Sequence, residues 1–356
     1  MSSIFGKSAL SPEWAERFRE IVKLNAYAQS TPVRLSNVVI EGYNLSGAKL
    51  SGAEFEKVEW KKVTLKSGEF TNTKFIHSSF EEVVFENVLF KDTVFEDAIF
   101  DASTFFHAEL LNVRFVRCQF KNAGLESLKA STISIEDSKL EDVSFFRSVI
   151  IATVRWSKFI DVGMTGLVAP SALTFEKSDL KEVNADDSIL SSLRATDSQI
   201  DATFKNAKIG RVEFEGSELD TSLSESVITS MIVASSKIKT LRMNSAKMDS
   251  VVIRDCEQTK NFGFYKATVR KIDVERSKLS DFDVAKTSVE TLRISNSTLS
   301  ETDFEELKAK SVSLENIFLD GKVDFTNAHI DQLTTKNITK LPSLNLITTG
   351  SNVKFD

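Results

Sequence analysis

Several residue types are scarce in this chain, and each scarcity excludes a class of protein. Among 356 residues there are two cysteines, Cys118 and Cys256, which excludes a disulfide-stapled framework. The three histidines are scattered, and no Cys/His cluster has metal-binding spacing. No run of about 18 apolar residues could form a membrane-spanning helix. A net charge of −6, from 51 acidic and 45 basic residues, gives no basic excess, so we expect no direct nucleic-acid binding.

The first ten residues lack the basic and then apolar pattern of a secretory signal peptide. A free-thiol composition is also usual in a reducing compartment. We therefore expect a cytoplasmic protein, and the alternative is an exported mature form whose signal has been removed.

The chain does have a repeat of five residues. Between Ile40 and Ile150 every fifth residue is large and apolar, with Ala130 as the exception. A second series of mostly small or β-branched residues lies two positions earlier, and it begins with Ala48 and Ala53. A period of five fits neither the helical period of 3.6 nor the strand period of 2. A fixed period over so many residues is typical of a solenoid.

Residues that repeat every five and all point inward require a quarter turn of chain per repeat. Four repeats then close a square coil of about twenty residues, and coils stack at about the strand spacing of 4.8 Å. Inward residues twenty apart form ladders, such as Phe55, Phe75, Phe95 and Phe115. We expect these aromatic ladders to fill the interior and leave no room for a ligand.

The pentapeptides Ala48-Lys49-Leu50-Ser51-Gly52 and Ala53-Glu54-Phe55 resemble the A(D/N)LXX motif of the pentapeptide-repeat family. The resemblance implies an all-β solenoid, a right-handed quadrilateral β-helix. Its period matches over roughly residues 36–335. Valine often replaces the motif's alanine, and Asp or Asn is mostly missing before the central residue.

The N-terminal part, residues 1–35, is expected to form an α-helical cap. Ser11–Ala28 begins with a Ser-Pro-Glu helix start and carries Trp14, Phe18 and Ile21 at helical spacing. Such a helix would cover the open first coil, since solenoids need capped ends. The alternative is a helix that binds a partner.

The rest of the chain divides by the phase of the repeat. We predict a regular, Phe-rich β-helix over 36–163, a loop over 164–174, a second β-helix with phase slips over 175–335, and a tail over 336–356. The loop is predicted from nearby glycines and a proline, and a second break is expected over 255–263. The tail would cap the last coil or pair with a second copy.

The residue two before each centre alternates between small and large in the second part. The series runs Ser178, Val183, Ser188, Leu193 and Ser198. Small and large faces in alternation predict a coil with a two-fold cross-section, because large and small residues compensate one another in dense cores.

Two surface features stand out in the first part. One is a set of outward apolar residues that forms a candidate interface, to be covered by the N-terminal helix, a partner or a second copy: Val84, Leu89, Val94, Ile99, Phe106, Leu111, Val116 and Phe146. The other is a candidate acidic surface, most simply explained as solvated exterior: Glu81, Glu82, Glu86, Asp92, Glu96, Asp97 and Asp101.

These features favour a non-catalytic, rod-like scaffold that binds other proteins through its faces. We expect no enzymatic activity, no metal and no cofactor, because no catalytic constellation is visible and a solid interior offers no concave site. The alternative comes from the resemblance, because some pentapeptide-repeat proteins mimic DNA, bind DNA gyrase or topoisomerase and protect it from inhibitors. A mimic needs dense negative charge along one face. One such ladder has mixed signs: Glu41, Lys61, Glu81, Asp101, Lys121 and Glu141.

Overall fold

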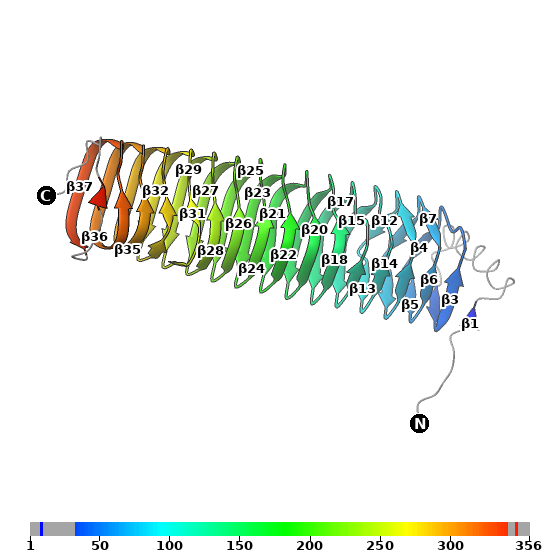
Figure 1. The fold of residues 1–356 in the computed structure, drawn as a ribbon. Helices are drawn as coiled ribbons and strands as arrows, with labels where there is room; N and C mark the ends of the chain where they lie inside the picture. The colour runs from blue at the N-terminus through cyan, green and yellow to red at the C-terminus, as the bar shows by residue number, and fades with distance from the viewer. Residues whose placement is uncertain (1–7, 10–32, 341–345, 348–356) are drawn as a thin grey trace, which may run out of the picture. The chain divides into compact units, whose positions relative to one another are not determined.

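The computed structural model describes residues 8–9, 33–340 and 346–347. It divides into two compact units, Met1–Thr174 (unit 1) and Phe175–Asp356 (unit 2), which are treated separately below. Every regular element in the described residues is a β-strand (Figure 1). Within these residues no helix is long and apolar enough to cross a membrane.

Unit 1 is built from short strands stacked in parallel. In the regular part each five-residue repeat supplies one strand. The strands of the unit are β1 (Ser8–Ala9), β2 (Arg34–Ser36), β3 (Val38–Glu41), β4 (Lys49–Ser51), β5 (Glu54–Glu56), β6 (Glu59–Lys61), β7 (Thr64–Lys66), β8 (Glu69–Thr71), β9 (Lys74–Ile76), β10 (Ser79–Glu81), β11 (Val84–Glu86), β12 (Leu89–Lys91), β13 (Val94–Glu96), β14 (Ile99–Asp101), β15 (Glu109–Val116), β16 (Gln119–Lys121), β17 (Lys129–Glu136), β18 (Lys139–Ser144), β19 (Val149–Arg155), β20 (Lys158–Gly163) and β21 (Val168–Glu176).

The register of these strands confirms the twenty-residue coil. Phe95 is paired with Phe75 on one side and with Phe115 on the other. Their rings stack with centroids 4.8 Å and 5.1 Å apart, and Phe95 is fully buried. Because the strand spacing brings equivalent rings into contact, one repeated residue type fills the core of many coils.

We number the sides of the unit 1 coil by their inward residues. Side 1 contains Phe80, side 2 Phe85, side 3 Phe90 and side 4 Phe95. In the regular repeats up to Arg147 the chain turns at the corners through a residue in the left-handed region two positions after the centre, for example Glu82 with φ 53°. This backbone conformation is uncommon outside glycine and supplies the quarter turn that the five-residue period requires.

Unit 2 has longer strands, and most of its coils contain two. The strands that follow β21 are β22 (Asp179–Asn184), β23 (Ile189–Thr196), β24 (Gln199–Thr203), β25 (Lys208–Glu215), β26 (Glu218–Ser222), β27 (Val227–Ala234), β28 (Lys237–Arg242), β29 (Lys247–Arg254), β30 (Glu257–Gln258), β31 (Phe262–Gly263), β32 (Thr268–Glu275), β33 (Lys278–Ser280), β34 (Phe282–Asp283), β35 (Ser288–Asp303), β36 (Lys308–Asp324), β37 (His329–Lys340) and β38 (Leu346–Ile347).

Two strands per coil agree with the two-fold cross-section predicted from the alternation of small and large residues. In the coil from Asp187 to Asn206 the left-handed residues are Asp187, Asp197 and Asn206, so two corners of the square have lost theirs. One of these corners is also one residue shorter. The pairing of β22 with β24 shifts register, and the residues that pair between β24 and β26 are nineteen apart in the chain. Phase slips in the sequence therefore mark corners that have been straightened.

A column of buried serines runs up one corner of unit 2. The backbone N–H of Ser198 donates to Ser217 Oγ at 3.2 Å, and the N–H of Ser217 donates to Ser236 Oγ at 3.1 Å. Each hydroxyl also donates to the carbonyl two residues earlier in its own chain, as Ser217 does to Glu215 at 2.9 Å. The serines are the small residues in the alternation of small and large inward residues. Each serine hydroxyl accepts a hydrogen bond from a backbone N–H that would otherwise be unpaired at the corner.

The loop predicted over 164–174 is wrong. Val168–Glu176 is strand β21, and Met164, Leu167, Ala169 and Leu173 are buried. Gly166 has φ 69° and occupies a corner position that other repeats fill with a non-glycine residue. The glycine signal therefore marked an ordinary corner of the coil.

The break predicted over 255–263 is also wrong, because these residues continue the stack of coils. Over 255–263 the short strands β30 and β31 pair with β28, and Gln258 takes an inward position opposite Ile238. Gln258 is buried although it is polar, and its Nε2 donates to the carbonyl of Lys260. The apolar period fails there because an amide replaces the expected apolar centre.

The two predicted caps fall largely outside the described residues. The helix predicted at Ser11–Ala28 lies wholly outside them, so the structure does not test it. Strand β1 nevertheless pairs with Val38 and Val39 of the first coil. Of the predicted tail, β38 pairs with Val323 and Asp324 in unit 2, and the remainder beyond residue 340 is not described.

We predict that Phe95→Ala destabilises unit 1 by about 3–5 kcal/mol, because it leaves a cavity between two stacked rings. Phe106→Ala is the matched control, since that ring is 43% exposed and its loss should cost less than about 1 kcal/mol. Denaturant unfolding followed by circular dichroism measures both. Equal losses in the two variants would contradict the register.

We predict that Ser217→Ala costs about 1–3 kcal/mol, because it leaves the N–H of Ser198 buried without its acceptor. Ser217→Cys should cost less, since Cys118 and Cys256 occupy equivalent positions, and their sulfurs accept backbone hydrogen bonds from Ala98 and Ser236. Ser191→Ala, at an exposed serine, is the control for thermal melts. Indistinguishable melting of the Ser217→Ala and control variants would show that the column contributes nothing.

Candidate binding groove

Unit 2 carries a surface groove of about 540 Å³ that crosses the strands β27, β29, β32, β35, β36 and β37. Its floor is the strand backbone at the inward positions, whose side chains point into the core and are at most 6% exposed, namely Ile228, Met248, Val269, Val289 and Ala309. The hollow lies between the two outward rows of side chains that flank this backbone. Six strands at about 4.8 Å give the groove a length of about 24 Å between the first and the last strand.

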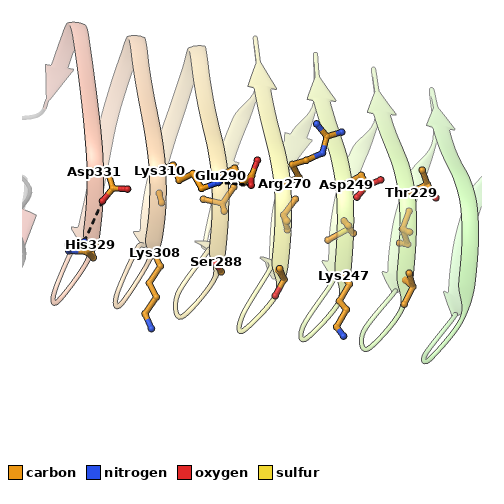
Figure 2. A pocket seen from close by; sticks show the side chains of 17 residues that line it. Thr229, Lys247, Asp249, Arg270, Ser288, Glu290, Lys308, Lys310, His329 and Asp331 are labelled. Carbon is orange, nitrogen blue, oxygen red and sulfur yellow. Dashed lines mark hydrogen bonds and ion pairs between the residues drawn. The ribbon is translucent and has the colours of Figure 1, made fainter.

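The two flanks of the groove differ in charge (Figure 2). The residues that precede the floor are Val227, Lys247, Thr268, Ser288, Lys308 and His329. The residues that follow it are Thr229, Asp249, Arg270, Glu290, Lys310 and Asp331. The first flank is therefore neutral or basic, and the second alternates in sign from one coil to the next.

Some of these charges are satisfied inside the groove. Lys310 Nζ lies 2.7 Å from Glu290 Oε1, and this hydrogen bond, with the charge of Lys310, lowers the pKa of Glu290. His329 Nε2 lies 3.5 Å from Asp331 Oδ1 across the last strand of the groove. Within the described residues Lys247 and Lys308 make no ion pair. The groove can therefore offer cations on one flank that are available to a bound molecule.

Sequence reasoning missed this groove. The available signal was the register, which places Lys247, Thr268, Ser288 and Lys308 in one column. Periodicity alone shows that these residues point outward. It does not show that the side chains beside them stand far enough apart to leave a hollow.

The predicted apolar interface does not form one patch. Val84, Leu89, Val94 and Ile99 lie on sides 2, 3, 4 and 1 of consecutive repeats. Each has polar neighbours in the adjacent coils, as Leu89 has in Glu69 and Glu109. Leu111 and Val116 lie on sides 3 and 4, and both are only partly exposed. Phe106 and Phe146 both lie on side 2, two coils apart. They are the two residues of the set whose side chains are widely exposed on the same side.

The predicted acidic surface is largely neutralised by the coils next to it. Glu86 lies 2.6 Å from Lys66, and Glu81 lies 3.9 Å from Lys61. Arg117 hydrogen-bonds both Glu96 and Asp97. Asp92 accepts a hydrogen bond from Asn112 at 2.8 Å. Glu81 and Asp101 are paired in adjacent coils, so these two carboxylates are neighbours. Glu82 lies beside them at the corner.

The sulfur and imidazole groups do not assemble into a reactive site. Burial raises the pKa of the Cys118 thiol to about 12, and burial also raises the pKa of Cys256. His77 lies 3.5 Å from Asp97 at the side 4 corner, whereas His107 stacks on Phe106 at the side 2 corner. The two histidines therefore lie on opposite sides. Within the described residues no group of three or more His, Cys, Asp or Glu is placed to hold a metal ion.

We predict that Arg117→Ala raises the pKa of Asp97, because the hydrogen bond from Arg117 is the main cause that holds it below its ordinary value. A carboxyl whose pKa is lowered by folding stabilises the fold above its unfolded pKa, near 3.9, and loses that contribution as the pH falls through the folded pKa. The variant should therefore melt lower than the wild type at pH 7 and equally at pH 2. An NMR titration of Asp97 measures the pKa, with Lys74→Ala as control. An unchanged Asp97 midpoint in Arg117→Ala would contradict the assignment.

No family model matches the chain, and no curated protein matches it by sequence. Solved structures with a similar backbone trace include HetL from the cyanobacterium Nostoc sp. strain PCC 7120. HetL is a pentapeptide repeat protein involved in heterocyst differentiation regulation. It is 12% identical over 75% of this chain and 94% of its own, with a TM-score of 0.21. QnrB1, a plasmid-mediated fluoroquinolone resistance protein, is 11% identical over 66% of this chain and 90% of its own, with a TM-score of 0.22.

The A-module of the Azotobacter vinelandii mannuronan C-5 epimerase AlgE6 is 7% identical over 91% of this chain and 94% of its own, with a TM-score of 0.26. At these identities and scores none of the three activities carries over to this chain. The architecture rests on its own register, in which five-residue repeats form coils that pair in parallel twenty residues apart. The chain is thus a parallel β-solenoid built from pentapeptide repeats, which confirms at the level of the fold the resemblance drawn from its sequence.

Proposed function

We propose that the protein is a non-catalytic scaffold that binds another protein through the groove of unit 2. The observation that supports this most directly is a groove between a neutral or basic flank and a flank of alternating sign, over six consecutive coils. The flanking side chains supply contact area, and the alternating flank sets the register of a bound segment through its charges.

An extended or helical segment of a partner suits the dimensions of the groove. A helix rises 1.5 Å per residue, so about 16 residues span the estimated 24 Å between the first and last strands. The segment would present carboxylates to Lys247 and Lys308, which make no ion pair within the described residues.

Filling the groove tests this function. We predict that Ser288→Trp, on the basic flank, abolishes capture of the partner, because the indole occupies the hollow above Val289. Thr291→Trp is the matched control, since it lies on the same strand, is exposed, and does not line the groove. Affinity capture with the three baits, followed by crosslinking from a photoreactive residue at position 288, measures the effect. Equal recovery by all three baits, or no crosslink at position 288, would contradict the proposal.

The DNA-mimic hypothesis stays a second and weaker proposal. In unit 1 the side 1 ladder pairs Glu41 with Lys61, Lys61 with Glu81, and Asp101 with Lys121. Opposite charges in neighbouring coils cancel within about one strand spacing, whereas a duplex carries one negative charge per about 1.7 Å. Binding to a purified type II topoisomerase that weakens steeply with salt would support this alternative over the groove.

We also propose a cytoplasmic location. Its support is that the two free cysteines, Cys118 and Cys256, are both buried in the described structure. Cell fractionation with an antibody to the native protein tests it, and recovery in the exported fraction would contradict it.

A further inference from the structure

The length of the groove in unit 2 suits an extended or a helical segment, but its width selects the extended one. Its flanks are the residues directly before and after one inward residue of each strand, about 6.6 Å apart at 3.3 Å per residue. A volume of about 540 Å³ over the estimated 24 Å gives a cross-section of about 22 Å². An extended chain occupies about 48 Å², from strand and sheet spacings of about 4.8 Å and 10 Å, and a helix about 10 Å wide occupies about 80 Å². The hollow therefore takes about half the width of an extended chain but only about a quarter of a helix.

Three exposed cations of the groove make no ion pair within the part of the chain that the structure describes, namely Lys247, Arg270 and Lys308. Lys247 and Lys308 stand on the first flank, and Arg270 stands on the second (Figure 2). Lys310, by contrast, is paired with Glu290. The groove therefore carries unpaired positive charge on both flanks, although the whole chain has a net charge of −6.

The register sets the distances between these cations along the groove. Lys247 and Lys308 lie in one column, three strand spacings or about 14.4 Å apart. Arg270 belongs to the coil next to that of Lys247, about 4.8 Å further along the groove.

An extended chain matches these distances. Its side chains point alternately to the two flanks at about 3.4 Å per residue, so residue i+4 returns to the first flank after about 13.6 Å and residue i+1 points to the second flank after about 3.4 Å. Both positions fall within about 1.5 Å of the cations they would meet. A helix returns to the first flank at residues i+7 and i+11, after about 10.5 Å and 16.5 Å, on either side of the distance required.

We propose that the groove binds an extended acidic segment of the partner, which runs across the strands with carboxylates at residues i, i+1 and i+4. Residues i and i+4 face Lys247 and Lys308, and residue i+1 faces Arg270. In the opposite chain direction the same contacts require carboxylates at i, i+3 and i+4. This inference rests on the proposed function, because it names the kind of segment that the groove takes.

The carboxylates of the second flank define where the segment is not acidic. Residue i+3 points to this flank after about 10.2 Å, beside Glu290, which lies about 9.6 Å along the groove. A carboxylate at i+3 would meet a like charge, so we expect a neutral or basic residue there. Asp249 lies across from Lys247, where side chain i points away from it.

Peptide binding to the full chain tests the spacing. The probes are labelled threonine peptides of nine residues, because threonine favours the extended conformation. Two of them carry three glutamates, at positions 3, 4 and 7 or at positions 3, 6 and 7, and cover the two chain directions. A third carries four glutamates, at positions 3, 4, 6 and 7. Fluorescence anisotropy should show that one three-glutamate peptide binds at least as tightly as the four-glutamate peptide, whose additional charge faces Glu290.

A charge reversal tests the contact. Lys308→Glu should weaken binding of that peptide at least about tenfold, because it places like charges together. Lys237→Glu is the matched control, since Lys237 is an exposed lysine of unit 2 that does not line the groove, and the change in net charge is the same. Tighter binding of the four-glutamate peptide than of both others, or equal weakening by the two variants, overturns the inference.

The capture experiment separates a failure of this inference from a failure of the proposed function. If no three-glutamate peptide binds below about 1 mM while Ser288→Trp still abolishes capture, the groove binds a different kind of segment. That result overturns the inference and leaves the function standing. If capture does not depend on Ser288→Trp, the proposed function fails and the inference fails with it.

Discussion

The contact on which the rest of the structure depends is the stacking of each inward side chain on the equivalent side chain one coil away. In unit 1 the backbone pairing of Phe75, Phe95 and Phe115 fixes the distance between their rings, and the rings in turn hold the coils at that spacing. Because the same contact recurs every twenty residues, a sequence rule of five residues is enough to specify a long core. The five-residue rule does not constrain the outward residues, so they can differ from one coil to the next.

This division explains how much could be predicted. The parallel solenoid, the four-sided coil of unit 1 and the change to a two-fold cross-section follow from inward residues such as Phe95, Ser198 and Leu193, since burial constrains their size at a fixed period. Gly166 and Gln258 were misinterpreted for the opposite reason. A glycine at a corner and an amide in a core column interrupt the composition of the repeat without interrupting its backbone.

The surfaces were less predictable, because they depend on which coils are neighbours and on how side chains stand apart. Seven carboxylates that are close together in the sequence suggested an acidic surface. The structure places Lys66 beside Glu86 and Arg117 beside Asp97, each twenty residues away in the chain. The groove above Val289 and Ala309 arises in the same way, from side chains brought together by the coil. A register of twenty applied to the outward residues would have revealed the partners of the carboxylates, whereas the hollow also depends on how far apart the flanking side chains stand.

The central claim is therefore the register itself, and a distance between two spin labels tests it most directly. Arg34 and Arg114 are exposed, eighty residues apart, and joined through Glu54, Lys74 and Val94 in one column of side 4 in unit 1. Nitroxides attached at these two positions should lie about 19 Å apart, from four coils at about 4.8 Å each, in one narrow distribution. A much longer distance, or a broad distribution, would contradict the twenty-residue coil.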